Sequence, residues 1–155
     1  MRFVQVTTPE QVDQARRLFQ EYAEALGISL CFQNFDQELA SLPGKYASPR
    51  GRLLLCFVQT DLVGCVAFRE IDADVCEMKR LFLRPAFRGR GLGGAMVEAI
   101  IGAAREVGYK RMRLDTLPGK MDAAIALYEQ AGFKEIPPYY DTPVVGTRFL
   151  ELVLA

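Results

Sequence analysis

Histidine and tryptophan are absent from this chain of 155 residues. Without histidine the protein cannot use a His general base, a Ser-His-Asp or Cys-His nucleophile system, or a His-ligated metal. Any catalysis must rely on carboxylates, Tyr, Cys, Lys, backbone groups or water, and we expect no metal cofactor.

Long apolar runs are also missing. None reaches the roughly 18 residues of a membrane span, and the N-terminus lacks the apolar core of a signal peptide. We expect no membrane contact.

Cysteine is scarce, and none of the four cysteines lies in a C-x-x-C pair. They are Cys31, Cys56, Cys65 and Cys76. Those at 56 and 65 lie in strand-like apolar runs, where a free thiol behaves as a small hydrophobic group. The pattern predicts reduced, mostly buried thiols in a cytoplasmic protein.

Neither sign of charge is in excess, because 19 basic residues balance 19 acidic ones. This balance excludes a polycation that coats nucleic acid. Hydrophobic residues make up 50% of the chain. A chain of this length buries about two-thirds of its unfolded surface, which is enough for one core. We therefore predict a single domain over residues 1–155.

Hydrophobic periodicity and turn residues divide the chain into helices and strands. The 3.6-residue period predicts helices over residues 9–27, 35–42, 91–108 and 121–131. Apolar or alternating runs predict strands over residues 2–6, 52–59, 62–69, 76–83, 111–116, 133–136 and 147–154, with a hairpin turn at Thr60 and Asp61. The order β-α-α-β-β-β-α-β-α-β-β is typical of an α/β fold, a mixed sheet with helices on both faces.

The segment that indicates chemistry joins the strand over 76–83 to the helix over 91–108. Five basic residues and no acidic residue lie between positions 79 and 90, and glycines stand at 89, 91, 93 and 94. The first N–H groups of a helix lack helical partners, and glycine lets an anion approach the backbone closely. The pattern predicts a diphosphate cradle. A Walker loop is absent, and the G-x-G-x-x-G spacing of residues 89–94 leaves too few residues after it for a doubly wound sheet.

Two motifs resemble those of the GCN5-related N-acetyltransferase (GNAT) superfamily. Residues 88–93 read RGRGLG, an R-x-x-G-x-G pattern, directly after a Leu-Arg-Pro triplet. Residues 124–133 read AIALYEQAGF, which is similar to the family's A-I-x-L-Y-x-x-x-G-F pattern. The element order matches as well. The resemblance implies a GNAT-like fold and an enzyme that transfers an acetyl or other acyl group from CoA to an amine, by direct attack in a ternary complex.

The resemblance also implies where acetyl-CoA binds as co-substrate. In the family the strands over 76–83 and 111–116 splay apart, so the pantetheine arm pairs with the main chain near Leu81, Leu83 and Arg84. The pyrophosphate then contacts the cradle, which consists of Arg88, Gly89, Arg90, Gly91, Leu92, Gly93 and Gly94. Met121 stands where the family often has an Asn that contacts pantetheine, so that side-chain hydrogen bond is lost.

The same resemblance implies a general acid. Tyr128 matches the family position at which a phenol lies near the CoA sulfur, and a phenol can protonate the leaving thiolate. The alternative is a buried helix residue whose hydroxyl is already satisfied.

A proton acceptor is also required, because an alkylamine is charged near pH 7. Family members often place a catalytic Glu on the strand that leads to the cradle, so Glu77 is our first choice. Alternation along this strand puts Glu77, Lys79, Leu81 and Leu83 on one face. The alternatives are an ion pair of Glu77 with a neighbouring cation, or a role for Asp115 or ordered water as the base.

The acceptor is not identified by any motif. In the family, the segments that correspond to residues 27–36 and 137–147 form the acceptor walls. The second contains Tyr139, Tyr140 and Asp141, which suit a cationic or amphipathic amine. Glu38 is interpreted as part of a solvated helix start.

We therefore expect a small-molecule amine or a peptide as acceptor, and a monomer or homodimer. Nucleic acid is not expected, because the basic run offers no aromatic platform interleaved with its basic residues. The alternative function is a non-catalytic sensor module of the same fold that binds acyl-CoA without turnover.

Overall fold

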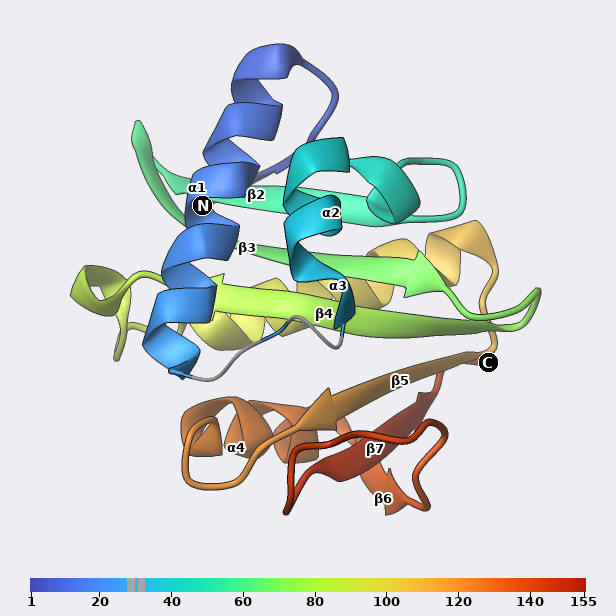
Figure 1. Cartoon of the computed structure of the whole chain (residues 1–155). Coiled ribbons are helices and arrows are strands. Elements are labelled where there is room, and N and C mark those ends of the chain that lie inside the picture. Colours follow the sequence, from blue (N-terminus) through green and yellow to red (C-terminus); the bar gives the residue numbers. More distant parts are fainter. Residues whose placement is uncertain (28–29, 31–32) are drawn as a thin grey trace.

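The computed structural model describes residues 1–27, 30 and 33–155. Its centre is a seven-stranded sheet with the order β1-β2-β3-β4-β5-β7-β6 (Figure 1). Neighbouring strands are antiparallel except β4 and β5, which are parallel. The strands are β1 (Arg2–Gln5), β2 (Arg52–Val58), β3 (Asp61–Glu70), β4 (Val75–Leu83), β5 (Arg111–Thr116), β6 (Lys134–Ile136) and β7 (Arg148–Val153). The predicted α/β fold class and element order are confirmed.

Helices cover both faces of the sheet, as predicted (Figure 1). On one face lie α1 (Pro9–Leu26) and α2 (Phe35–Ser41), followed by the short 3-10 helix η2 (Gly44–Tyr46). On the other lie α3 (Leu92–Val107), preceded by η3 (Pro85–Phe87), and α4 (Asp122–Ala131). Each face has its own buried core, one around Phe19 and the other around Met96. In the part of the chain that the structure describes, no helix is long and apolar enough to cross a membrane.

Capping residues determine where α1 begins and ends. The Thr8 hydroxyl accepts the Gln11 N–H at 3.2 Å, and the Gln11 side chain accepts the Thr8 N–H at 3.0 Å, which is a capping box. Gly27 ends the helix at φ 70°, in the left-handed region. These caps fix the length of the helix that crosses the front of the sheet.

The cysteines behave as small hydrophobic residues. Cys56, Cys65 and Cys76 are buried free thiols, as predicted, whereas Cys31 lies outside the described residues. Burial raises the pKa of Cys56 to about 11 and that of Cys76 to about 12. These thiols therefore stay protonated at neutral pH.

The β2–β3 turn lies one residue earlier than predicted. Asp61 pairs with Val58, so the turn residues are Gln59 and Thr60, with Gln59 at φ 55°. The register shifts between Cys56 and Phe57, and this irregularity displaces the turn by one position.

The parallel strands β4 and β5 separate within the sheet. Their paired residues end at Glu77 and Arg113, although β4 continues to Leu83 and β5 to Thr116. Beyond this point, the side of β4 that faces β5 has no strand partner. The splay implied by the family resemblance is therefore present, and Figure 1 shows the two strands diverging.

A bulge in β4 overturns the expected alternation of its side chains. Cys65 pairs with Phe82 but Ala67 pairs with Lys79, so two residues of β4 face one residue of β3. Arg80 adopts φ 62° at this bulge. Glu77 and Lys79 therefore face α1 and α2, whereas Leu81 and Leu83 pack against the core under α3. The prediction of one shared face was wrong, because the bulge reverses the phase of the strand.

Candidate active site

The Gly-rich connection opens α3 as an anion cradle. Gly89 and Gly91 adopt φ 80° and 77°, a region that L side chains rarely enter, and a Cβ at either position would have no atom within 4 Å. Gly91 is the N-cap of α3 and has no side chain to cap the first N–H groups. Those N–H groups point out of the helix end, where the dipole favours an anion.

Gly93 has a different role in the structure. A Cβ at Gly93 would lie 2.8 Å from the Leu127 side chain of α4, whereas one at Gly94 would lie at 3.9 Å, an ordinary contact. Gly93 therefore permits close packing of α3 against α4, and its N–H remains in the first turn. Leu92 packs against the core with its side chain.

The three arginines of the predicted cofactor site differ in their availability. Arg88 and Arg90 are exposed; Arg88 Nε donates to the Leu83 carbonyl at 2.9 Å, and Arg90 lies over the Phe87 ring. Arg84 is already bound within the protein. Its guanidinium donates to Glu21 at 2.8 and 3.0 Å, and also to a backbone carbonyl of β3. The side chain of Arg84 therefore fixes the end of β4 against α1.

The main chain of β4 presents free groups at the splay. The Arg84 N–H donates to the Val63 carbonyl of β3 at 2.8 Å. Because N–H groups alternate in direction along a strand, those of Leu83 and Leu81 point away from β3. An extended amide chain in the splay would find these groups available as partners.

Tyr128 lies on α4, near Asp115 of β5. The residue is 3% exposed and packs against Phe133. Burial, together with the nearby Tyr22 and Asp115, raises the pKa of Tyr128 above its ordinary value. The phenol therefore carries its proton at neutral pH, and within the described residues no hydrogen bond engages it.

Glu77 is an ionised carboxylate at the point where β4 and β5 separate. Its carboxylate accepts Arg69 Nε at 2.9 Å on one oxygen and the Tyr139 hydroxyl at 2.5 Å on the other. Burial raises its pKa, but the charge of Lys79, the Tyr139 hydrogen bond and Arg69 outweigh burial and bring the pKa below its ordinary value.

Asp115 is the second carboxylate of the site. It accepts a hydrogen bond from the Tyr140 hydroxyl and lines a small cavity of about 30 Å³ together with Tyr22 and Met121. Tyr139 also packs edge-on against Tyr140. The structure therefore brings both predicted tyrosines to the two candidate bases.

Asp141 is not part of this cluster. Its side chain is exposed and makes no hydrogen bond or ion pair with the residues that the structure describes. The predicted wall over 27–36 lies partly outside the described residues, which exclude 28–29 and 31–32.

Sequence reasoning missed a buried ion pair beside this site. Glu38, interpreted as a solvated residue, is 8% exposed and accepts two hydrogen bonds from Arg80, at 2.8 and 3.1 Å. The interpretation was wrong, because α2 packs its Glu38 side onto the sheet above the bulge. The available signal was Arg80 itself, since a charge in a buried strand needs a partner.

Comparisons with known proteins show which family this chain is similar to. The model of the acetyltransferase (GNAT) family matches residues 12–133. An uncharacterized N-acetyltransferase of Schizosaccharomyces pombe is 38% identical over 152 residues, with 97% of this chain and 93% of the relative covered.

Two solved structures show the same fold. An acetyltransferase from Streptococcus agalactiae is similar with a TM-score of 0.79 at 23% identity, over 98% of this chain and 97% of the other. A GNAT family acetyltransferase from Elizabethkingia anophelis with acetyl-CoA bound is similar with a TM-score of 0.65 at 18% identity, over 98% and 97% of the two chains.

Proposed function

The chain belongs to the acetyltransferase (GNAT) family and is an N-acetyltransferase, and from this premise we propose that it transfers the acetyl group of acetyl-CoA to a primary amine of a small molecule or peptide. The transfer occurs by direct attack of the amine in a ternary complex. The observation that carries the proposal is one continuous path, in which the anion cradle of α3 adjoins the unpaired side of β4, and the splay leads to Tyr128.

The residues present fit acetyl-CoA as the co-substrate. The pyrophosphate is held by the first N–H groups of α3, from Leu92 to Gly94, and by the side chains of Arg88 and Arg90. The open space at Gly89 and Gly91 supports this fit, since it leaves room for an anion to approach the backbone. The pantetheine amides pair with the main chain of β4 near Leu81 and Leu83, in the manner of an added strand.

Tyr128 acts as the general acid in this proposal. Its raised pKa keeps the phenol protonated at neutral pH, so the hydroxyl can donate to the CoA sulfur as negative charge develops there. CoA leaves as the thiol when the sulfur takes this proton, and Tyr128 is reprotonated by the proton that the amine releases, through solvent. The absence of a competing hydrogen bond within the described residues leaves the hydroxyl proton available.

Glu77 remains our first choice for the group that removes the amine proton. It lies on the acceptor face, is ionised, and is located where β4 and β5 separate. Its low pKa makes it a weak direct base, so it acts best through an ordered water. Asp115 is the alternative, because it lies near Tyr128 and shares a cavity with Tyr22.

The proposal is tested with a panel of primary amines and acetyl-CoA, by following free thiol release and the mass of the acetylated product. We expect a mass gain of one acetyl group on at least one amine, with stoichiometric thiol. Binding of acetyl-CoA with no turnover across the panel would instead support the sensor function.

A further inference from the structure

Two buried carboxylates on the α1–α2 face of the sheet each lie beside two cations. Glu77 has Arg69 at 2.9 Å and Lys79 at 3.6 Å. Glu38 has Arg80 at 2.8 Å and Lys45 at 3.5 Å. Each group of three charges therefore has a net charge of +1. We name Lys45 and Lys79 together the lysine pair.

In both groups the arginine donates hydrogen bonds to the carboxylate, whereas the lysine lies near the carboxylate without donating one to it. One Glu77 oxygen accepts Arg69 and the other accepts the Tyr139 hydroxyl. Lys79 lies beyond hydrogen-bond distance of Glu77 and donates to none of the described residues, although its side chain is only 8% exposed. The Lys79 ammonium therefore keeps donors free for a further acceptor, and its positive charge favours an anion in that role.

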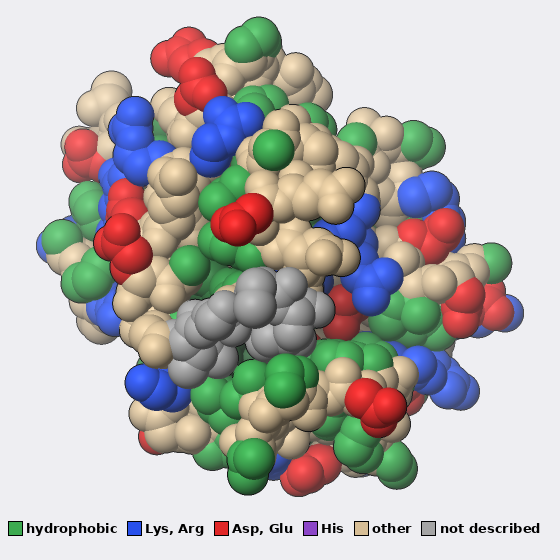
Figure 2. Space-filling model, viewed as in Figure 1, with side chains coloured by type: hydrophobic (Ala, Val, Ile, Leu, Met, Phe, Trp, Pro, Cys, Tyr) green, Lys and Arg blue, Asp and Glu red, His purple; other side chains and the backbone are tan. Residues whose placement is uncertain are grey.

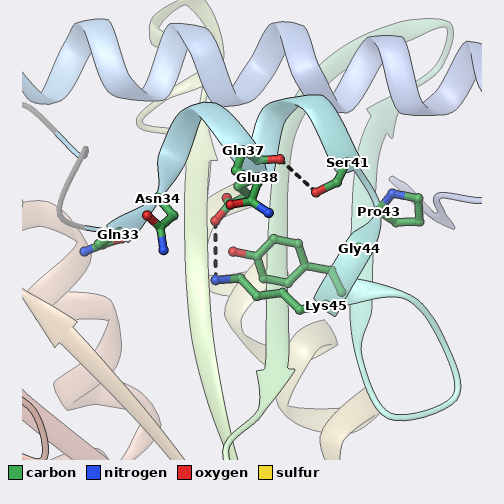
Figure 3. A pocket seen from close by; sticks show the side chains of 9 residues that line it. Gln33, Asn34, Gln37, Glu38, Ser41, Pro43, Gly44 and Lys45 are labelled. Atoms are coloured by element: carbon green, nitrogen blue, oxygen red, sulfur yellow. Dashed lines mark hydrogen bonds and ion pairs between the residues drawn. The ribbon is translucent and has the colours of Figure 1, made fainter.

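Lys45 is more exposed than Lys79, with 41% of its side chain exposed, but the carboxylate beside it is likewise already occupied. Both oxygens of Glu38 already accept Arg80, and the Lys45 Nζ approaches only one of them (Figure 3). Burial lowers the pKa of Lys45, and the positive charges of Lys79, Arg69 and Arg80 lower it further against the effect of Glu38. The lysine pair therefore belongs to one field of uncompensated positive charge. Figure 2 shows Lys and Arg side chains gathered beside α2, over β3 and β4.

The lysine pair lies next to the place where the acceptor amine must enter. Lys79 is the first residue on this face beyond the last β4–β5 pair, so it stands at the opening of the splay. Lys45 lines a cavity of about 290 Å³ between α2 and η2. Gln33 lines both this cavity and the small cavity beside Asp115, so the two adjoin.

Unsatisfied polar groups also mark the larger cavity. The Gln33 side-chain oxygen and the Tyr46 hydroxyl are buried, and neither has a hydrogen-bond partner within the described part of the chain. On this face Arg113 pairs with Glu151 at 2.8 Å. Among the described residues, Asp115 accepts only the Tyr140 hydroxyl, so its carboxylate is available to a cationic group.

We propose that the acceptor is an amine that also carries an anionic group, a carboxylate or a phosphate, and that the lysine pair binds this group. This inference rests on the proposed function, from which it takes that the acceptor is a primary amine. The amine lies toward Asp115 and Tyr128, and the anion lies toward Lys79 and Lys45. Polycationic amines are excluded by the same field, because like charges repel.

The test uses acceptors that differ only in the anion. Glycine is compared with glycinamide, phenylalanine with phenethylamine, and phosphoethanolamine with ethanolamine, each with saturating acetyl-CoA. We expect kcat/KM to be about tenfold or more higher for the anionic member of a pair, from the usual strength of a charged hydrogen bond. The first two pairs report on a carboxylate and the third on a phosphate. Equal values within all three pairs, or a preference for the uncharged member, would overturn the proposal.

Variants show whether the lysine pair causes the preference. Lys79→Gln and Lys45→Gln should each reduce the preference for the anionic member, mainly through KM. Lys110→Gln is the matched control, because Lys110 is exposed and pairs only with Asp74 at the far end of β4. An undiminished preference in both test variants would also overturn the proposal.

A binding measurement separates this inference from the proposed function. Calorimetry of N-acetylglycine and N-acetylglycinamide with the wild type needs no turnover. Carboxylate-dependent binding that is lost in Lys79→Gln but kept in Lys110→Gln supports the anion site even if no amine is acetylated. Equal affinity for both compounds, with turnover intact, contradicts the anion site and leaves the acetyltransferase proposal standing.

Discussion

The guanidinium of Arg80 binds the carboxylate of Glu38 through two hydrogen bonds, of 2.8 and 3.1 Å, inside the protein. Arg80 occupies the left-handed position of the β4 bulge, and Glu38 belongs to α2. The pair therefore joins the bulge beside the proposed reaction centre to the helix that lines the proposed acceptor cavity. Its contribution depends on both members, because Arg80 without Glu38 would be a buried charge without a counter-ion, and Glu38 without Arg80 would keep only Lys45 at 3.5 Å.

Glu38→Gln should reduce the free energy of unfolding by about 3 kcal/mol, because it leaves a buried guanidinium unpaired. Urea unfolding followed by circular dichroism measures this loss. Glu135→Gln is the control, since Glu135 is exposed and its pair with Arg148 should contribute about 1 kcal/mol or less. Equal stability losses in the two variants would contradict the structural role of the Arg80–Glu38 pair.

Gly91→Asp should weaken acetyl-CoA binding about tenfold or more relative to Gly91→Asn, because the carboxylate competes with the pyrophosphate for the cradle. The Asn variant has nearly the same shape without the charge, and Asn tolerates the left-handed backbone at this position. Calorimetry with CoA gives both affinities. Identical affinities in the two variants would place the pyrophosphate elsewhere.

Tyr128→Phe should lower kcat about 10²-fold while the affinity for acetyl-CoA stays within a small factor, because the variant loses the acidic proton but keeps the ring. Steady-state kinetics and calorimetry separate the two effects. Tyr109→Phe is the control, as Tyr109 belongs to the same core but its hydroxyl donates to the Arg50 carbonyl. Wild-type turnover in Tyr128→Phe would mean that the residue serves only packing.

Glu77→Gln should lower kcat/KM near pH 7 and recover activity as the pH rises, because more of the amine is then neutral without help from a base. The pKa of Glu77 lies below its ordinary value, so the wild-type carboxylate is ionised from mildly acidic pH upward and its own titration does not limit activity above pH 6. The pH–rate profile over pH 6–9 makes the comparison. Asp115→Asn is measured in parallel, and a wild-type profile for Glu77→Gln with an altered one for Asp115→Asn would assign the base to Asp115.

Much of the architecture was predictable from periodicity and turn chemistry. The strand–glycine–helix connection and the caps of α1 are determined by residues that lie close together in the sequence, so they can be recognised from one sequence alone. The bulge at Arg80 was harder to predict, although two adjacent charged residues, Lys79 and Arg80, interrupt the alternation of β4. An extra residue in a strand is favoured by tertiary partners, here Glu38 from a helix 42 positions earlier in the chain.

The candidate site was predictable to a similar degree. The resemblance placed Tyr128 and Glu77 on their elements, and the aromatic segment at Tyr139 was recognisable from composition. The partners of Glu77 were not, because Arg69 and Tyr139 reach it from β3 and from the segment before β7. Cross-strand and loop contacts depend on register, which no local pattern fixes here.

The contact of Gly93 with Leu127 affects the length of the molecule that fits between the start of α3 and Tyr128. Because a Cβ at Gly93 would lie 2.8 Å from the Leu127 side chain, the missing side chain of Gly93 sets how closely α3 packs against α4, and with it the span between the start of α3 and the phenol of Tyr128, the residue after Leu127. Two rigid helices thus act as a gauge of fixed length. Under the proposed function, a molecule whose phosphates occupy the cradle would present its far end to the phenol only if its arm matched that length, so the packing of the two helices would select for the size of the carrier before any side chain selects for its chemistry.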